Sequence, residues 1–244
     1  MKLLMTSDLH GNWPALLAVA QNEENVDGVA CLGDIVNYGP NPAQCVEWVQ
    51  SNVKVGWAVQ GNHDRAVGCD EDPKCSGPYR KLAAEMQRYT RKQVRQAGRA
   101  FLARLPTSTT PVLKGGAIFF FCHAAPTDPL YAYVEQGDTK RWSRECEFAG
   151  YPDFLFCGHT HLPFICKIGR TTVVNPGSVG QPKGGDPCAH YAVWRDGEVT
   201  LRSVAYDIEK VVKDLDGCAS AKTTAALASI LRNGGNFPDA SDTP

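Results

Sequence analysis

Five short segments of this sequence concentrate side chains that bind metal ions, and each segment follows an apolar run. The segments are Asp8-Leu9-His10, Gly33-Asp34, Gly61-Asn62-His63-Asp64, Cys122-His123 and Gly158-His159-Thr160-His161. Five of the six histidines lie in them, and only His190 lies elsewhere. A single histidine is more often a core or surface residue, but this concentration of histidine beside aspartate and asparagine indicates a metal site.

Seven side chains in these segments are candidate metal ligands. They are Asp8, His10, Asp34, Asn62, His123, His159 and His161. A spacing of two, as in Asp8/His10 and His159/His161, sends both side chains to the same side of an extended segment. Imidazoles mixed with carboxylates and an amide oxygen suit Mn, Fe, Co, Ni or Zn, and seven ligands are too many for one ion. We therefore expect two divalent metal ions. The alternative, polar strand ends without metal, would bury two aspartates and four histidines together at considerable cost.

Such a centre has a definite chemistry. Two dications beside the charges of Asp8 and Asp34 leave a positive site that attracts a phosphate group. Ions about 3.5–4 Å apart share a bridging water, lower its pKa toward neutrality and hold the resulting hydroxide in line with phosphorus. Hydrolysis of a phosphate ester then needs no protein nucleophile. Ser178 is not expected to be one, because its surroundings lack the Gly-x-Ser-x-Gly pattern of serine hydrolases.

Four further residues are candidates for catalysis or substrate binding. His63 follows the candidate ligand Asn62 and is the expected general acid, a role that contributes about 10²–10⁴-fold in rate. Asp64 would orient the His63 ring. The alternative is that His63 stabilises charge on the phosphoryl group. Tyr38 and Arg65 are candidate substrate-binding residues, although an exposed arginine is often an ordinary surface residue.

The elements that position these residues follow from apolar runs. Lys2–Ser7, Val26–Gly33 and Val55–Gly61 are expected to be strands. Helices are expected between them, one capped by Asn12 and the other starting at Asn41-Pro42. This βαβαβ order predicts parallel strands, with ligands bound at their carboxyl ends.

A long basic helix is expected next, over Tyr79–Arg99, ending around Gly98 and Pro106. It contains many arginines and lysines but only one acidic residue, Glu85. Such a helix either contacts nucleic acid or forms a solvated face. We favour the solvated face, because the rest of the protein offsets this charge.

The second half of the chain contains more strands, several of them separated only by turns. The expected strands are 117–122, 154–157, 164–168, 171–175, 191–195 and 198–205. Ile168-Gly169-Arg170 and Asp196-Gly197 are hairpin signals, so an antiparallel portion is expected to pack against the first sheet. A final helix carries Leu227, Ile230 and Leu231. We expect one domain over residues 1–234 and a flexible tail over residues 235–244.

Composition excludes several classes of protein. Of the 244 residues 43% are hydrophobic and 21% charged, which is ordinary for a globular chain, and the net charge of −1 gives no long-range field for a polyanion. The longest apolar run is far shorter than the roughly 20 residues of a membrane span, and Asp8 interrupts the N-terminal one. We expect a cytoplasmic protein without a membrane partner. Its ten cysteines form no CxxC pair and are expected to be mostly buried thiols.

The metal-binding segments, in this order, resemble those of the calcineurin-like metallophosphoesterases. That family's pattern D-x-H, G-D, G-N-H-D, H and G-H-x-H is matched over roughly residues 1 to 190. Two longer stretches resemble its small prokaryotic phosphodiesterase branch. They are residues 33–40, GDIVNYGP, and residues 175–182, NPGSVGQP.

The resemblance implies an α/β fold, a four-layer α/β/β/α sandwich of two mixed sheets with the dimetal site at one edge. It implies that Asp8, His10 and His161 hold the first ion. It implies that Asn62, His123 and His159 hold the second, and that Asp34 bridges both. No ligand position of the family pattern is missing.

We therefore expect a dinuclear metal-dependent phosphoesterase that acts on a small phosphate ester, and favour a phosphodiesterase. The sequence leaves the preference between monoesters and diesters open. Two alternatives stay open: a nuclease that acts on DNA or RNA through the basic helix, and a binding scaffold of the same fold without catalysis. The sequence does not identify the physiological substrate, the native metal or the oligomeric state.

Overall fold

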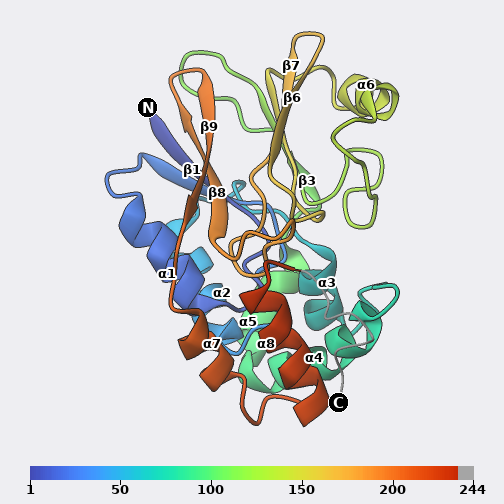
Figure 1. Cartoon of the computed structure of the whole chain (residues 1–244). Coiled ribbons are helices and arrows are strands. Elements are labelled where there is room, and N and C mark those ends of the chain that lie inside the picture. The colour runs from blue at the N-terminus through green and yellow to red at the C-terminus, as the bar shows by residue number, and fades with distance from the viewer. Residues whose placement is uncertain (236–244) are drawn as a thin grey trace.

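Two β-sheets face each other in the computed structural model, which describes residues 1–235 (Figure 1). The first has the order β2-β1-β8-β9. Its strands are β1 (Lys2–Thr6), β2 (Gly28–Cys31), β8 (Ala189–Arg195) and β9 (Glu198–Val204). The second has the order β3-β4-β5-β7-β6. Its strands are β3 (Ser108–Thr109), β4 (Phe119–Cys122), β5 (Phe154–Phe156), β6 (Phe164–Ile168) and β7 (Thr171–Asn175).

Both sheets mix parallel and antiparallel pairs. In the first, β1 is parallel to β2 and antiparallel to β8. In the second, β4, β5 and β7 are parallel, whereas β3 and β6 are antiparallel to their neighbours. The parallel strands bring their carboxyl ends to one edge of each sheet.

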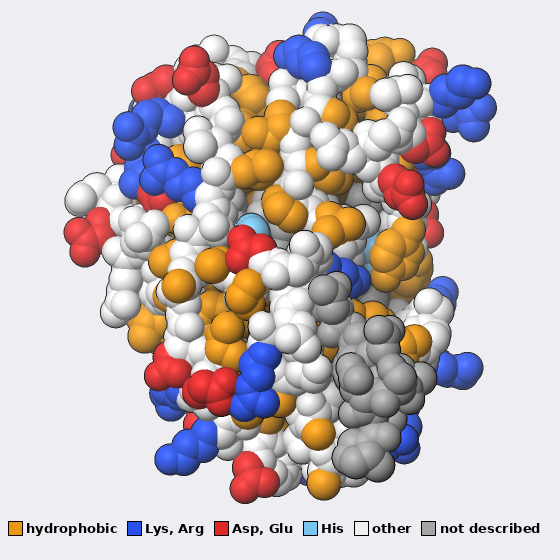
Figure 2. Space-filling model, viewed as in Figure 1, with side chains coloured by type: hydrophobic (Ala, Val, Ile, Leu, Met, Phe, Trp, Pro, Cys, Tyr) orange, Lys and Arg blue, Asp and Glu red, His pale blue; other side chains and the backbone are white. Residues whose placement is uncertain are grey.

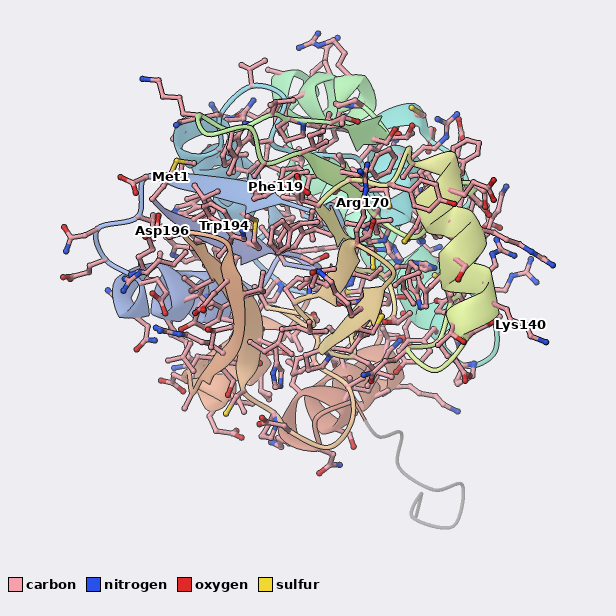
Figure 3. All side chains as sticks on the ribbon, turned by 90° about the horizontal axis from the view of Figure 1, so that it is seen from above. Met1, Phe119, Lys140, Arg170, Trp194 and Asp196 are labelled. Carbon is pink, nitrogen blue, oxygen red and sulfur yellow. The ribbon has the colours of Figure 1, made fainter. Side chains whose placement is uncertain are left out.

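An aromatic core fills the space between the sheets. Leu3 and Met5 of β1 face this core, together with Phe119, Phe121 and Phe156 of the second sheet. The ring of Phe119 meets that of Trp194 edge to face at 5.3 Å, between the two sheets in Figure 3. Because side chains alternate along a strand, Leu4 points the other way, into the core beneath the outer helices.

Helices cover the outer faces of both sheets. On the first sheet α1 (Trp13–Asn22) and α2 (Pro42–Asn52) bury apolar residues against the strands. On the second, α6 (Thr139–Phe148) packs through Trp142 and Cys146. The layers therefore run α/β/β/α around two mixed sheets, which confirms the predicted fold class.

The remaining helices form a lobe beyond the sheet edge that carries the candidate ligands. They are α3 (Asn62–Cys69), α4 (Tyr79–Gln93), α5 (Gln96–Arg104), α7 (Ile208–Asp214) and α8 (Ala221–Arg232). A shared apolar cluster joins α4, α7 and α8, which Figure 1 shows below the sheets. The flexible tail that we predicted over residues 235–244 lies outside the described residues, except for Gly235. No helix within residues 1–235 is both long and apolar enough to cross a bilayer.

Several predicted elements differ from the structure. Val55–Gly61 is not a strand, since Ala58 forms only an isolated parallel bridge with Cys31. The predicted helix Tyr79–Arg99 is two helices, because Val94 between α4 and α5 adopts an extended backbone and buries its side chain beneath α1 and α2. The β8–β9 hairpin extends the first sheet instead of packing against it, since β8 pairs with β1.

The basic helix uses part of its charge to hold its own surroundings. Arg91 donates to the carbonyl of Val67, and Arg99 donates to the carbonyls of Arg91 and Val94. On the face seen in Figure 2, basic and acidic side chains are interspersed. These contacts favour the interpretation of the helix as a solvated face over a nucleic-acid contact.

The buried carboxylate of Glu23 forms ion pairs with two strands of the first sheet, β1 and the edge strand β9. Glu23, which follows α1, contacts Lys2 Nζ at 2.8 Å and Arg202 Nη1 at 2.6 Å, and accepts a hydrogen bond from Tyr191. Burial works to raise the pKa of Glu23, but the hydrogen bonds from Lys2, Tyr191 and Arg202 outweigh it and hold the pKa below its ordinary value of 4.5. The ionised form of Glu23 therefore stabilises the folded state.

We predict that Glu23→Gln lowers the free energy of unfolding by about 1–3 kcal/mol at neutral pH, because its ion pairs are lost while their basic partners stay partly solvated. The folded-state pKa lies below the unfolded one, so this contribution is present above pH 4.5 and disappears as the pH falls through the folded-state pKa. Urea unfolding of both proteins across this range measures it. Glu24→Gln, at the exposed neighbouring position, is the control, and an equal effect of both variants would contradict the assignment.

Candidate metal centre

The candidate ligands sit on loops at the carboxyl ends of strands. Asp8 and His10 follow β1, Asp34 follows β2, His123 follows β4, and the pair His159/His161 follows β5, while Asn62 begins α3. The first two loops are joined by backbone hydrogen bonds, from Asp8 N to Gly33 O and from His10 N to Asp34 O. None of the seven candidate ligand residues is more than 6% exposed. The fold thus collects all seven predicted ligands in one buried place.

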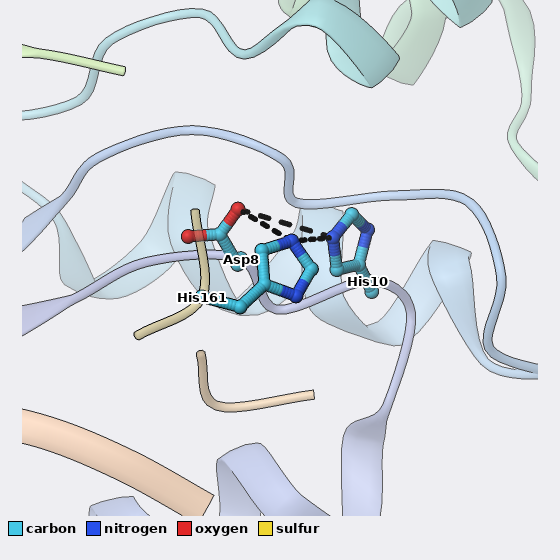
Figure 4. A group of neighbouring side chains, drawn as sticks. All are labelled: Asp8, His10 and His161. Carbon is cyan, nitrogen blue, oxygen red and sulfur yellow. Dashed lines mark hydrogen bonds and ion pairs between the residues drawn. The ribbon is translucent and has the colours of Figure 1, made fainter. Parts of the chain in front are cut away.

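The ligands fall into two groups that each fit one ion. Asp8, His10 and His161 form the first group, shown in Figure 4, and their ligand atoms lie within 4.8 Å of one another. Within it the Nε2 atoms of His10 and His161 are 3.2 Å apart. Asp34, His123 and His159 form the second group by the same criterion.

Asp34 and Asn62 complete the geometry. Asp34 Oδ2 lies 3.8 Å from Nε2 of His10 in the first group and 3.2 Å from Nε2 of His123 in the second. This carboxylate therefore lies between the groups. Asn62 Oδ1 lies 3.2 Å from His123 Nε2, and its amide nitrogen donates to the carbonyl of Pro73. That hydrogen bond leaves the amide oxygen facing the second group.

Hydrogen bonds on the far side of three imidazoles favour the tautomer that a metal needs. The Nδ1 atoms of His10, His123 and His161 each face a backbone carbonyl, at 3.2, 2.8 and 2.5 Å. An Nδ1–H that donates to such a carbonyl leaves the Nε2 lone pair directed into the centre. Neighbouring lone pairs then repel each other unless a cation lies between them. The residues present thus fit a pair of cations.

The charge states in the centre point the same way. Burial, helped by nearby His161, lowers the pKa of His10 to about 3, and burial with nearby His123 lowers that of His159 to about 3. Both rings are neutral, as metal ligands must be. Burial also disfavours charge on His123, but the Asp34 carboxylate prevails and raises its pKa to about 9. A metal ion bound there would replace the proton of His123 as the partner of Asp34.

The backbone of the ligand loops is not extended, contrary to the expectation from the spacing of two. Asp8, His10, His159 and His161 have φ values of 53°, 45°, 65° and 62°. Asp8 and His10 still share one group, but His159 and His161 divide between the two groups. The strands end before these residues, so strand alternation does not apply to them. Left-handed conformations cost energy in non-glycine residues and are common at functional sites.

Two glycines allow the loops to approach one another. A Cβ on Gly61 would lie 2.1 Å from Asp34 Oδ1, and a Cβ on Gly158 would lie 1.9 Å from the hydroxyl of Ser7. Neither contact is sterically allowed. These positions need glycine because loops from different strands touch there.

The 175–182 segment holds the ligand loops in place. Asn175 Nδ2 donates to the carbonyl of Gly158, and the hydroxyl of Ser178 donates to the carbonyl of Asp8. The carbonyl of Gln181 is the acceptor for His161. Ser178 is fully buried and also accepts from Gln181 N, so its hydroxyl has a structural task. The sequence signal for this role was the motif itself, whose function only the contacts reveal.

His63 lies beside the groups without belonging to either. Its Nδ1 contacts Asn37 Nδ2 at 2.7 Å, and the same amide nitrogen also faces the carbonyl of Ala83. Asn37 therefore donates to Nδ1, which places the ring proton of neutral His63 on Nε2. Burial lowers the pKa of His63 to about 4, so the ring is neutral at pH 7.

Asp64 does not orient this ring, contrary to the expectation. Its carboxylate accepts from the backbone amides of Ile35 and Gly61. By accepting from the amide of Gly61, the Asp64 carboxylate caps the start of α3. Asn37 takes the orienting position instead, and Asp64 ties the loops after β2 and before α3 together.

Tyr38 and Arg65 differ in their relation to the centre. The Tyr38 ring packs at 5.0 Å from His10 and 4.8 Å from His63 and lines the cavity above the ligands. Arg65 is not among the cavity-lining residues and makes a two-point ion pair with Glu71. Arg65 lies two positions after His63 on α3, so its side chain leaves from a different face of the helix. This geometry does not support a substrate contact by Arg65.

The cavity over the centre has a volume of about 70 Å³. Besides six predicted site residues it is lined by side chains that were not candidate site residues in the sequence. They include Lys74, Cys75, Tyr79, Tyr131, Tyr133, Gln181 and Lys183. Sequence reasoning missed them because they come from four separate loops or helix ends and share no spacing.

Known proteins are similar to this chain in sequence and in fold. The family model of the calcineurin-like phosphoesterase superfamily domain matches residues 1–195. An uncharacterized protein of Methanocaldococcus jannaschii is 32% identical over 238 residues, covering 87% of this chain and 92% of that protein. The phosphodiesterase YfcE of Escherichia coli is 26% identical over 203 residues, covering 78% of this chain and 85% of that protein.

A solved structure has the same architecture throughout. The metallophosphoesterase of Sphaerobacter thermophilus superposes with a TM-score of 0.80 at 27% identity, covering 96% of this chain and 99% of that one. The family match includes every candidate ligand loop and the 175–182 segment. The chain belongs to the calcineurin-like phosphoesterase superfamily.

Proposed function

We propose that this protein is a dinuclear metal-dependent phosphoesterase, and specifically a phosphodiesterase that acts on small phosphate esters. The observation that carries the proposal is the convergence of two buried ligand groups on one carboxylate, Asp34. Membership of the superfamily and the similarity to a phosphodiesterase support it.

In this proposal each group holds one ion. Asp8, His10 and His161 bind the first, and Asn62, His123 and His159 bind the second, with Asp34 shared between them. Mixed imidazole and carboxylate ligands suit Mn, Fe, Co, Ni or Zn. When bound, two such ions polarise phosphate oxygens and lower the pKa of water toward neutrality.

The chain's own residues do the rest. Loops of both sheets orient the phosphate over the ligands, and burial of the centre limits the approach of bulk water. His63 presents its Nε2–H, because Asn37 donates to Nδ1. We assign to His63 a hydrogen bond to the leaving or phosphoryl oxygen. Tyr38 packs on both His63 and His10 and so keeps their rings in register.

The two alternative functions have less support. A nuclease acting through the basic helix would need that charge free, whereas Arg91 and Arg99 are engaged with backbone carbonyls. A scaffold without catalysis does not require the ligand set and its supporting hydrogen bonds to be complete.

The direct test is hydrolysis after metal removal and replacement. The protein is stripped with chelator, supplied separately with Mn²⁺, Ni²⁺, Zn²⁺ or Mg²⁺, and assayed on bis-p-nitrophenyl phosphate, p-nitrophenyl phosphate, cyclic nucleotides and dinucleotides. We expect no activity in the stripped protein, recovery with at least one transition metal, and preference for diesters. Absence of hydrolysis under every metal would refute the proposed activity.

We predict that Asp34→Asn removes or scrambles the metal pair, because the amide keeps the size and one acceptor oxygen of the side chain but loses the charge shared by both groups. Elemental analysis should find fewer than two ions per chain. Asp216→Asn, at an exposed position after α7, is the matched control. A full complement of metal in Asp34→Asn would contradict the bridging assignment.

We predict that His63→Ala retains both metal ions and loses turnover by about 10²–10⁴-fold, since His63 belongs to neither ligand group but can donate to a reacting oxygen. Steady-state kinetics on the best substrate of the panel, together with metal content, checks this. A rate equal to that of the wild type would remove His63 from the mechanism, and loss of metal would make it a ligand.

A further inference from the structure

The outer part of the cavity carries aromatic and cationic side chains that the metal centre does not use. Tyr133 comes from the loop after β4, Tyr79 from the start of α4, and Lys183 from the chain that follows the 175–182 segment. All three line the same cavity as His63 and Asp34. Their chemistry adds information on the substrate.

Tyr133 offers a flat surface next to the centre. Its residue is 69% exposed, yet its ring is held 4.2 Å from the ring of the ligand His159, at an interplanar angle of 44°. The face of an exposed ring in such a position can stack with a planar group of a ligand. Stacking of a nucleobase on an aromatic side chain strengthens binding substantially and tolerates any base.

Lys183 offers a positive charge without a carboxylate partner. Its Nζ lies 5.2 Å from the centroid of the Tyr79 ring, and none of the ion pairs found among residues 1–235 includes it. Burial lowers the pKa of Lys183, while the charges of Asp8 and Asp34 act in the opposite direction. The ammonium group is therefore partly desolvated and close enough to the centre to interact with its carboxylates.

Metal ions would change the balance around Lys183. They neutralise Asp8 and Asp34, which are the negative charges that favour the ammonium form. A cation beside a positive centre is then stabilised only by an anion in the cavity. One phosphate occupies the metal centre in the proposed function, so a second anionic group is the natural partner of Lys183.

We propose that the substrate is a small nucleotide ester whose base stacks on Tyr133 and whose second phosphate, beyond the one that is hydrolysed, pairs with Lys183. This proposal rests on the proposed function and names its substrate class. The cavity itself, of about 70 Å³, admits only a small group, so the base would lie at its rim on the exposed ring of Tyr133. A polymer would need a longer basic groove than Lys74 and Lys183 provide at this cavity.

The test compares two dinucleotides that differ by one phosphate, pApA and ApA, with bis-p-nitrophenyl phosphate as a substrate that lacks a second anionic group. We expect the wild type to show a kcat/KM for pApA about ten- to a hundredfold above that for ApA, the range of a hydrogen bond to a charged group. In Lys183→Met the two dinucleotides should become equivalent, mainly through the KM of pApA, whereas kcat/KM for bis-p-nitrophenyl phosphate should fall far less than kcat/KM for pApA. Lys92→Met, an exposed lysine on α4 outside this cavity, is the control.

Tyr133 is tested by a pair of variants. Tyr133→Ala should raise the KM of both dinucleotides about tenfold or more, because it removes the stacking surface. Tyr133→Phe retains the ring and should behave as the wild type. Equal effects of both variants would assign Tyr133 a role through its hydroxyl and would overturn stacking.

Binding separates this proposal from the proposed function. Calorimetry with adenosine 3′,5′-bisphosphate and adenosine 5′-monophosphate should show tighter binding of the bisphosphate to the wild type and equal binding to Lys183→Met. If bis-p-nitrophenyl phosphate is not hydrolysed but this preference is present, the proposed activity fails and the nucleotide site stands. If the diester is hydrolysed but Lys183→Met affects all substrates alike, or long single-stranded RNA is preferred to pApA, the nucleotide site is refuted and the activity stands.

Discussion

The repulsion among buried, converging ligand atoms is the constraint on which the rest of this structure depends. Imidazole nitrogens of His10 and His161 face each other at 3.2 Å, and two aspartates lie in the same solvent-excluded space. Such an arrangement is stable only when cations or protons lie between the groups. Hydrogen bonds from the surrounding backbone fix this arrangement. Backbone carbonyls accept from the Nδ1 atoms of three imidazoles, and the 175–182 segment donates to a ligand loop.

The sandwich architecture explains why loops from distant parts of the chain can meet. Parallel strands in each sheet bring their carboxyl ends to one edge, and the aromatic core around Phe119 keeps the two sheets together. Ligand loops from both sheets then face one another across a short gap. Gly61 and Gly158 permit their contact, and the left-handed conformations of Asp8 and His159 aim the side chains inward.

In the proposed function, substrate recognition would depend on different elements from metal binding. The ligands come from strand ends, whereas Tyr79, Tyr133 and Lys183 come from the helical lobe and from long connections. Proteins with the same centre can therefore differ in substrate by changing these outer side chains while the chemistry is retained.

The sequence by itself determined the types of the candidate ligands and their order along the chain, because apolar runs that end in Asp, His and Gly are local patterns. The two-sheet fold followed from the family resemblance that these motifs carry. The sequence also located His63. It did not determine the break at Val94, the irregular path of Val55–Gly61 or the orienting contact of Asn37, and it placed Arg65 in the cavity where the structure pairs it with Glu71. The family resemblance, and not the spacing of two, had already divided His159 and His161 between the groups. Only the tertiary structure decided that Tyr133 and Lys183 line one cavity. These features arise from contacts between segments far apart in the chain, and such contacts leave no periodic trace in the sequence.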